Sequence, residues 1–269
     1  MTQKVAVLGT GKIGEALLSG MIRAGWSPAD LLVTARRPER AEELRARYGV
    51  EAVSNAEAAK AADTLILAAK PQDMAALLDE LAPHVAADRL VISAAAGIPT
   101  AFFEERLVEG LAVVRVMPNT PVLVDEGMSV ISAGSHATEA HLVRTEEIFK
   151  PVGKTLRVPE KNQDAATALS GSGPAYFYYL VEAMTDAGIL LGLPRAQAHD
   201  LIVQSAIGAA VMLRDSGEHP VKLREAVTSP AGTTISAIRE LENHGVRAAL
   251  IAALEAARDR SRELASGDG

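Results

Sequence analysis

The stretch that most constrains the fold is an apolar run that leads into three glycines. Residues 5–8 have the composition of a buried β-strand, and Gly9, Gly11 and Gly14 follow with G-x-G-x-x-G spacing. In a strand–turn–helix unit, these glycines permit a tight turn, close approach of the backbone to a pyrophosphate, and close packing of the helix on the strand. A helix beginning near Gly11 directs N–H groups and its positive dipole end toward phosphates. The stretch predicts a dinucleotide site, although an ordinary glycine-rich turn has the same pattern.

Strand and helix patterns alternate from this stretch to about residue 158. Helices are expected to end near Gly25, to open at Pro38 and to be capped by Asp73. Strands are expected at residues 31–35, 64–69, 90–97, 111–117, 128–132 and 155–158, with a helix over 137–149. The alternation predicts an α/β fold with an N-terminal Rossmann-like, doubly wound sheet of about seven or eight strands. We assign this dinucleotide-binding domain to residues 1–160.

From residue 161 the pattern becomes helical, which predicts an all-α C-terminal domain over residues 161–269. Three long segments, 174–191, 194–213 and 246–265, are too apolar around their circumference for single helices with one solvated face. They require a partner, either within a helical bundle or in a second subunit. If the partner is a second subunit, this domain carries oligomerisation, and a hydroxyl-rich turn at residues 227–235 within it adds substrate binding as an expectation.

Composition excludes several classes of function. The chain has no cysteine, which rules out disulfides, thiolate catalysis and Cys-metal sites, and we expect no metal site. A formal net charge of −7 argues against a general nucleic-acid or acidic-membrane surface. Neither a signal peptide nor an apolar run of transmembrane length is visible, so a cytoplasmic location without membrane attachment is expected.

The end of the second predicted strand indicates which dinucleotide is bound. NAD-selective folds of this kind usually place an acidic residue there, where it bonds the ribose 2′-hydroxyl. Here Arg36 and Arg37 occupy that position, with Arg40 following. Two guanidinium groups can bind a 2′-phosphate, and no carboxylate is expected nearby to repel it. The sequence favours NADP over NAD, although a solvated basic helix start remains an alternative. Lys70, at the end of a later strand, is expected beside the same crevice.

Three C-terminal features could complete an active site. Residues 170–174 form a small-residue turn in which Ser172 can act as a helix cap or approach a ligand. His219 is a lone loop histidine, which is usually without function. Residues 227–235 hold four hydroxyl side chains in a turn that leads into a helix. Several N–H and O–H donors therefore converge at one helix N-terminus, which predicts a carboxylate-binding site.

Together, residues 117–121 (MPNTP), 170–176 (SGSGPAY) and 228–234 (TSPAGTT) resemble pyrroline-5-carboxylate reductase, which carries out the last step of proline synthesis. The resemblance covers nearly the whole chain. It implies an NADPH-binding Rossmann domain joined to a helical domain, with NADH as an acceptable second cofactor. It also implies a homodimer formed by interleaved C-terminal helices, which in this family can assemble further into a decamer.

The same resemblance implies roles for individual residues. The cofactor would be held by Gly9, Gly11, Lys12, Ile13 and Gly14 at the pyrophosphate, Arg36 and Arg37 at the 2′-phosphate, Asn55 near the adenosine ribose, Ala69, Lys70 and Pro71 along its length, and Ala96 and Asn119 near the nicotinamide. The substrate would be held by Ser172, Ser229, Gly232, Thr233 and Thr234. Thr234 is the expected catalytic residue, its hydroxyl bonding the ring nitrogen while NADPH reduces 1-pyrroline-5-carboxylate to L-proline.

One position departs from the family pattern. We call the turn at residues 227–235 the hydroxyl turn. The family commonly has two glycines after the proline of this turn, whereas this chain has Ala231 at the first of these two positions. An alanine with positive φ would cost on the order of 1 kcal/mol. We therefore expect a negative φ at Ala231.

Two other functions are compatible with a Rossmann domain followed by helices. The β-hydroxyacid dehydrogenases resemble this organisation, but their catalytic lysine would fall on Phe177 in the register that begins at Gly171. The missing amine argues against that class. A non-catalytic NADP-sensing protein would explain the glycine loop but leaves the hydroxyl turn without a purpose.

Overall fold

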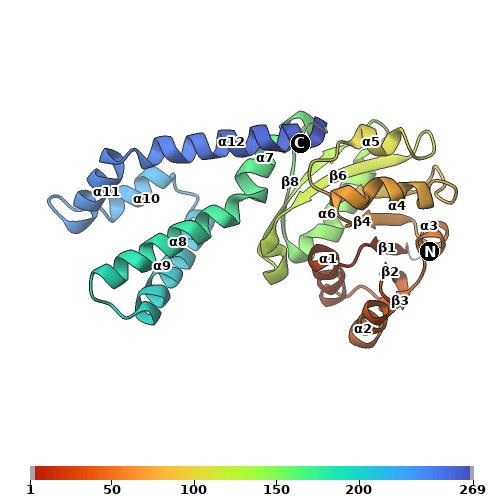
Figure 1. The fold of residues 1–269 in the computed structure, drawn as a ribbon, viewed down its shortest axis with the longest axis horizontal. Helices are drawn as coiled ribbons and strands as arrows, with labels where there is room; N and C mark the ends of the chain where they lie inside the picture. The colour runs from red at the N-terminus through yellow and green to blue at the C-terminus, as the bar shows by residue number, and fades with distance from the viewer. Residues whose placement is uncertain (1–3, 267–269) are drawn as a thin grey trace. The chain divides into compact units, whose positions relative to one another are not determined.

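The computed structural model describes residues 4–266 and divides them into two compact units. Residues 4–172 and 257–266 form the first unit, and residues 173–256 form the second. The first holds a sheet with helices on both faces, and the second is built of helices (Figure 1). The predicted fold class is therefore confirmed. Residues 161–172 belong to the first unit by their contacts, and a functional boundary after residue 160 remains a prediction.

The sheet has eight strands in the order β3-β2-β1-β4-β5-β6-β7-β8. They are β1 (Val5–Leu8), β2 (Leu31–Thr34), β3 (Glu51–Ala52), β4 (Thr64–Leu67), β5 (Leu90–Ser93), β6 (Ala112–Pro118), β7 (Gly127–Ala133) and β8 (Gly153–Arg157). All neighbouring pairs are parallel except β6 and β7, which are antiparallel. Leu8 pairs with Thr34 on one side and Leu67 on the other, so the ends of β2 and β4 flank the end of β1. The short strand β3 was not predicted.

Helices of the first unit cover both faces of the sheet (Figure 1). They are α1 (Lys12–Arg23), α2 (Pro38–Tyr48), α3 (Asn55–Ala61), α4 (Met74–Leu81), α5 (Thr100–Glu104), α6 (Glu139–Phe149) and α7 (Gln163–Ala166). Short 3₁₀ turns connect them at η1 (Pro28–Asp30), η2 (Pro71–Asp73), η3 (Thr120–Val124), η4 (Lys150–Val152) and η5 (Glu160–Asn162), and a π-turn, η6 (Thr167–Gly171), ends the series. The sequence did not predict α3, which begins with a capping box between Ser54 and Glu57.

Each face of the sheet has its own apolar core. Val5 and Val7 of β1 pack with α1, α2 and α6, whereas Ala6 and Leu8 pack with α3, α4 and α5. All four residues are fully buried, because the helices cover the strand on both sides. This is why β1 is a continuous apolar run and not an alternating one.

The expected capping role of Asp73 is wrong. Asp73 stands at the N-cap position of α4, but its side chain makes no cap bond. Its backbone is helical, with φ −96° and ψ −4°, whereas a capping residue usually adopts the extended conformation that turns its side chain back toward the first-turn N–H groups. The carboxylate pairs instead with Arg36.

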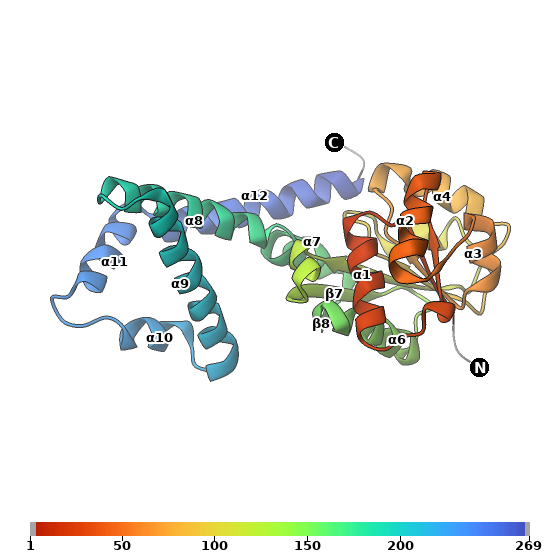
Figure 2. The ribbon, with the colours of Figure 1, turned by 90° about the horizontal axis from the view of Figure 1, so that it is seen from below.

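The second unit consists of α8 (Gly173–Leu190), α9 (Arg195–Ser216), α10 (Pro220–Ala226), α11 (Thr233–Asn243) and the first half of α12 (Val246–Ser266). Helices α8 and α9 form a hairpin (Figure 2) and approach closely where a Cβ at Gly188 would lie 2.7 Å from the Cβ of Ala198. Both helices leave large apolar side chains exposed, including Phe177 at 66% and Leu201 at 60%. Within the second unit, residues 173–256, these faces stay uncovered. Among residues 4–266, every helix falls short of the length and apolarity that crossing a bilayer requires.

Candidate dinucleotide cleft and hydroxyl turn

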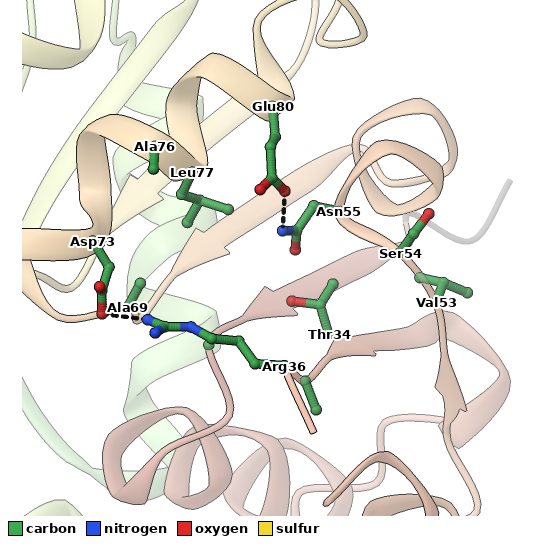
Figure 3. Close-up of a pocket in the computed structure, with 12 residues that line it drawn as sticks. Thr34, Arg36, Val53, Ser54, Asn55, Ala69, Asp73, Ala76, Leu77 and Glu80 are labelled. Carbon is green, nitrogen blue, oxygen red and sulfur yellow. Dashed lines mark hydrogen bonds and ion pairs between the residues drawn. The ribbon is translucent and has the colours of Figure 1, made fainter. Parts of the chain in front are cut away.

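A cleft opens at the carboxyl ends of β1, β2 and β4. It consists of two adjoining cavities of about 470 and 730 Å³ that share Gly9, Ala35, Arg36, Ala69 and Asp73. The order of the strands reverses here, because β2 and β3 follow on one side of β1 and β4 to β6 on the other. Ligands of doubly wound sheets bind at such a point. Figure 3 shows the smaller cavity.

The three glycines of the first loop have three different surroundings. Gly9 has φ +89°, and a Cβ on it would lie 2.7 Å from the backbone nitrogen of Ala69, so this residue makes the tight turn against β4. A Cβ on Gly14 would lie 2.6 Å from the carbonyl oxygen of Gly9, which reflects the close packing of α1 on the loop. Gly11 lines the larger cavity, and no atom lies within 4 Å of the position its Cβ would take. The missing side chain at Gly11 therefore leaves space for a ligand.

The loop is held in place by a charged network beneath it. Nε of Arg40 lies 3.4 Å from the carbonyl oxygen of Thr10, and the same guanidinium pairs with the carboxylate of Glu15. The hydroxyl of Tyr48 also donates to Glu15 at 2.9 Å. Burial raises the pKa of Glu15, but the hydrogen bonds from Arg40 and Tyr48 outweigh it and hold that pKa below its usual range. Arg40 is thus committed to the loop, which leaves Arg36 and Arg37 as the exposed guanidinium groups of the cleft.

The charge of the larger cavity is predominantly positive. Its lining includes five basic side chains, from Lys12, Arg36, Arg37, Arg40 and Lys70, and two acidic ones, from Glu15 and Asp73. Together with the open space at Gly11, this lining fits a dinucleotide phosphate group.

Two of the residues expected to bind the cofactor interact with carboxylate side chains of the chain itself. Arg36 pairs with Asp73, and Nδ2 of Asn55 donates to Oε2 of Glu80 at 2.7 Å (Figure 3). The expectation that no carboxylate lies near Arg36 is therefore wrong. Asp73 comes from η2, which follows β4, and only the order of the strands brings it opposite the end of β2.

The remaining expected cofactor residues lie outside the linings of these two cavities. They are Ile13, Gly14, Pro71, Ala96 and Asn119. Ile13 packs against the core, Pro71 begins η2, and Ala96 is exposed after β5. Their proximity to a cofactor stays a prediction.

Asn119 connects three segments of the first unit. Its Oδ1 accepts from the backbone nitrogen of Met128 at 2.8 Å, and its Nδ2 donates to the carbonyl oxygen of Ser170 at 3.1 Å and to the Ser170 hydroxyl at 3.3 Å. Ser170 lies in the π-turn η6, and π-turns occur often at functional sites. Ser172 follows this turn and donates its N–H to the carbonyl oxygen of Thr167 at 2.9 Å. Asn119 therefore holds the small-residue turn against the sheet.

The hydroxyl turn lies in the second unit, between α10 and α11. Within it, Thr228 donates its hydroxyl to the carbonyl oxygen of Arg224 at 2.6 Å, and the N–H of Gly232 bonds the carbonyl of Ser229 at 3.1 Å. Gly232 is the N-cap of α11 and supplies no side-chain cap bond. The first-turn N–H groups of α11 have no partner within the helix, and Thr233 and Thr234 are the first two residues of that helix.

The expected negative φ at Ala231 is wrong. The structure has φ +55° at this residue, which lies between Pro230 and the extended Gly232. The turn requires a left-handed residue here to bring the chain into α11, and the alanine accepts that conformation at some cost.

This strain leads to a stability prediction. We expect Ala231→Gly to raise the free energy of unfolding by about 1 kcal/mol, because glycine adopts positive φ without a steric penalty. Urea unfolding at one fixed protein concentration measures the change. Ala237→Gly, inside the same α11, serves as the matched control and should lower stability by about 1 kcal/mol. A loss of stability in Ala231→Gly would contradict the strain.

Two further features of the sequence have structural roles. Nδ1 of His219 accepts from the backbone nitrogen of Val221 at 3.3 Å, which caps α10. Within residues 4–266, no group of three or more His, Asp or Glu side chains is placed to hold a metal ion.

Comparisons with known proteins place these features in context. A protein-family profile described as "Pyrroline-5-carboxylate reductase dimerisation" matches residues 160–264, and one described as "NADP oxidoreductase coenzyme F420-dependent" matches residues 4–97. The chain is 47% identical to pyrroline-5-carboxylate reductase of Corynebacterium melassecola, over 97% of this chain and 98% of the relative. It is 43% identical to the enzyme of Methanosarcina acetivorans over the same shares of the two chains.

Solved structures give the same result. A pyrroline-5-carboxylate reductase from Coxiella burnetii matches with a TM-score of 0.93 and 34% identity, covering 98% of this chain and 99% of that one. The NADP-bound pyrroline carboxylate reductase of Plasmodium falciparum matches with a TM-score of 0.86 and 29% identity, covering 98% of each chain.

Proposed function

The chain belongs to the pyrroline-5-carboxylate reductase family, and on that premise we propose how it carries out the reaction. It is an oxidoreductase that reduces the cyclic imine 1-pyrroline-5-carboxylate to L-proline with NADPH, the last step of proline biosynthesis. The observation that carries this function is 47% identity to a named reductase over 97% of the chain, a span that includes both the cleft and the hydroxyl turn.

The cofactor fits the cleft at the ends of β1, β2 and β4. We assign its pyrophosphate to Gly9, Gly11 and Lys12, where the loop is open and α1 begins. Its 2′-phosphate is assigned to Arg36 and Arg37, which are exposed at the larger cavity. The other proposed cofactor contacts are Ile13, Gly14, Asn55, Ala69, Lys70, Pro71, Ala96 and Asn119. NADPH, when bound, supplies the hydride that reduces C5 of the imine.

The substrate carboxylate is assigned to the hydroxyl turn. Uncapped N–H groups at the start of α11, together with nearby hydroxyls, form a favourable site for an anion. The proposed substrate ligands are Ser172, Ser229, Gly232, Thr233 and Thr234. Fixing the carboxylate orients the ring, so that only one face of the imine is presented for reduction.

Thr234 is the proposed catalytic residue. Its hydroxyl would bond the ring nitrogen, but a hydroxyl is too weak an acid to protonate an imine outright. We infer that Thr234 orients the iminium and relays a proton from water to the nitrogen. The chain contributes mainly positioning of two bound partners, since the cofactor carries the redox chemistry.

We expect Thr234→Ala to lower kcat by about 10-fold or more, because removing one donor typically costs on the order of 1 to 3 kcal/mol. The affinity for NADPH should not change, since the residue contacts substrate only. Thr234→Ser keeps the hydroxyl and should restore most of kcat. Stopped-flow NADPH oxidation and fluorescence titration measure the two quantities. Unchanged kcat in Thr234→Ala would refute the assignment.

A single assay separates this function from the alternatives. NADPH oxidation by the purified chain is followed with five-membered and six-membered imine acids and, in reverse, with hydroxy acids and NADP⁺. Turnover on imines alone supports the reductase. Phe177, in place of a catalytic lysine, predicts no activity on hydroxy acids. Binding of NADPH without turnover on any imine would favour an NADP-sensing protein.

The second unit carries the dimerisation function. The family profile for dimerisation covers residues 160–264, which include the exposed apolar faces of α8 and α9. We propose a homodimer formed through these helices, with further assembly to a decamer, in a cytoplasmic enzyme. Light scattering after size exclusion measures the assembly, and cell fractionation measures the location.

A further inference from the structure

We propose that Asp73 sets the preference between NADPH and NADH by competing with the 2′-phosphate for the guanidinium of Arg36. The inference rests on the proposed placement of the cofactor in the cleft. It concerns one residue that the motifs of the chain do not single out as a cofactor ligand.

The two side chains meet across the mouth of the cleft. Arg36 follows the end of β2, and Asp73 ends η2 after β4. Each residue therefore lies just after a strand that flanks β1. Both residues line both cavities, and they form an ion pair (Figure 3). The Arg36 side chain is 74% exposed and that of Asp73 is 32% exposed. Asp73 is thus the better anchored partner, and Arg36 is the one free to turn toward a ligand.

The carboxylate and a 2′-phosphate need the same donors. A guanidinium binds either anion through its planar fork of N–H groups, so a phosphate on Arg36 must displace Asp73 or accept a carboxylate beside it. The second arrangement is repulsive, since both groups are negative. A ribose 2′-hydroxyl has neither difficulty, because it can donate a hydrogen bond to a carboxylate. Asp73 therefore disfavours NADPH and favours NADH.

Arg36 and Asp73 act in opposite directions on cofactor choice. Folds of this kind usually read the 2′ position with a residue at the end of the second strand, acidic for NAD and basic for NADP. This chain supplies the basic residue from that position and an acidic one from the loop after β4. The measured preference is then the difference between the two effects.

The experiment compares Asp73→Asn with the wild-type chain. Titration with NADP⁺ and with NAD⁺, followed by steady-state kinetics with NADPH and NADH, gives the ratio of the two affinities and of the two kcat/KM values. We expect each ratio to shift toward the phosphorylated cofactor by about 2- to 5-fold, in the range that one exposed ion pair can supply. Folding should be little affected, because so exposed an ion pair contributes little to stability.

Two further variants make the result specific. Asp79→Asn removes the same charge from α4, the helix that directly follows η2. Asp79 is exposed and lines neither cavity, so the NADPH/NADH ratios of affinity and kcat/KM should not change. In an Arg36→Ala background, Asp73→Asn should shift the ratios by much less than in the wild-type background, because the contested guanidinium is gone and only the direct effect of the Asp73 charge remains.

The outcomes separate the inference from its premise. Suppose that Arg36→Ala weakens NADP⁺ binding, but Asp73→Asn leaves the NADPH/NADH ratio unchanged or lowers it. The inference about Asp73 is then wrong, while the placement of the 2′-phosphate stands. A full shift that persists in the Arg36→Ala background overturns competition for Arg36. If Arg36→Ala leaves NADP⁺ affinity unchanged, the placement of the 2′-phosphate is wrong and the inference falls with it. Titrations need no imine substrate, so a failure of the proposed reaction would show separately in turnover.

Discussion

Gly11→Val is expected to weaken NADPH binding by about 100-fold or more, which corresponds to about 2.7 kcal/mol, while the protein remains folded. Gly11 has φ −75° and ψ −163°, an extended conformation that does not require glycine. Its Cβ position has no atom within 4 Å, so the fold has room for the side chain. Gly11 also lines the larger cavity, where a pyrophosphate would approach the backbone. Fluorescence titration with NADPH and thermal unfolding measure the two effects.

Gly9→Ala is the matched control in the same loop. Gly9 has φ +89°, and its Cβ would lie 2.7 Å from the backbone of Ala69, so this smaller change should lower the melting temperature. The pair therefore separates a substitution that destabilises the fold from one that leaves the fold intact and weakens NADPH binding. NADPH affinity within a factor of about 2 of wild type in Gly11→Val would contradict the placement of the pyrophosphate.

The sequence was sufficient to predict most of the first unit, because six of its eight strands are mostly apolar runs bounded by turn residues. The edge strand β8 is largely polar and was predicted only in part, at residues 155–158. The strand β3 escaped prediction since it is only Glu51–Ala52, one residue of which is exposed. Helix α3 could have been found, because Ser54 and Glu57 have the spacing of a capping box.

The charged contacts of the cleft could not be predicted in the same way. Asp73 stands where local sequence favours a helix cap, and its actual partner, Arg36, is 37 residues away in the chain. Glu15 and Arg40 are likewise 25 residues apart. Such pairs depend on which strand lies beside which, and alternating strand and helix patterns do not specify that order.

Ala231 shows a second reason why the sequence did not predict the structure correctly. Inferring its φ from residue type assumed that the chain avoids a penalty of order 1 kcal/mol, whereas the path of the turn into α11 determines the backbone conformation. A penalty of that size is tolerable in a protein stabilised by about 5 to 15 kcal/mol. The alanine was misleading because a residue type alone does not show where a fold accepts backbone strain.

Asn119→Ala is expected to lower the free energy of unfolding by about 3 kcal/mol, since a buried polar group left unpaired costs on the order of 1 to 3 kcal/mol. The substitution leaves two groups without their partner, the backbone N–H of Met128 and the carbonyl of Ser170. It also frees the π-turn η6 from the end of β6, so kcat should fall together with stability if Ser172 contacts substrate. Urea unfolding at one protein concentration and steady-state kinetics measure these changes.

Two variants define what Asn119 does. Asn119→Asp keeps an acceptor for Met128 but places a carboxylate oxygen opposite the carbonyl oxygen of Ser170, so two acceptors face each other and the variant should lose at least as much stability as the alanine variant. Asn162→Ala removes an exposed amide that makes no cap bond on α7 and should change stability by less than about 0.5 kcal/mol. A stable Asn119→Ala protein with weakened NADPH binding alone would show that this amide serves the nicotinamide and not the turn. Parallel losses of stability and kcat, with NADPH affinity retained, would show that Asn119 acts through Ser170.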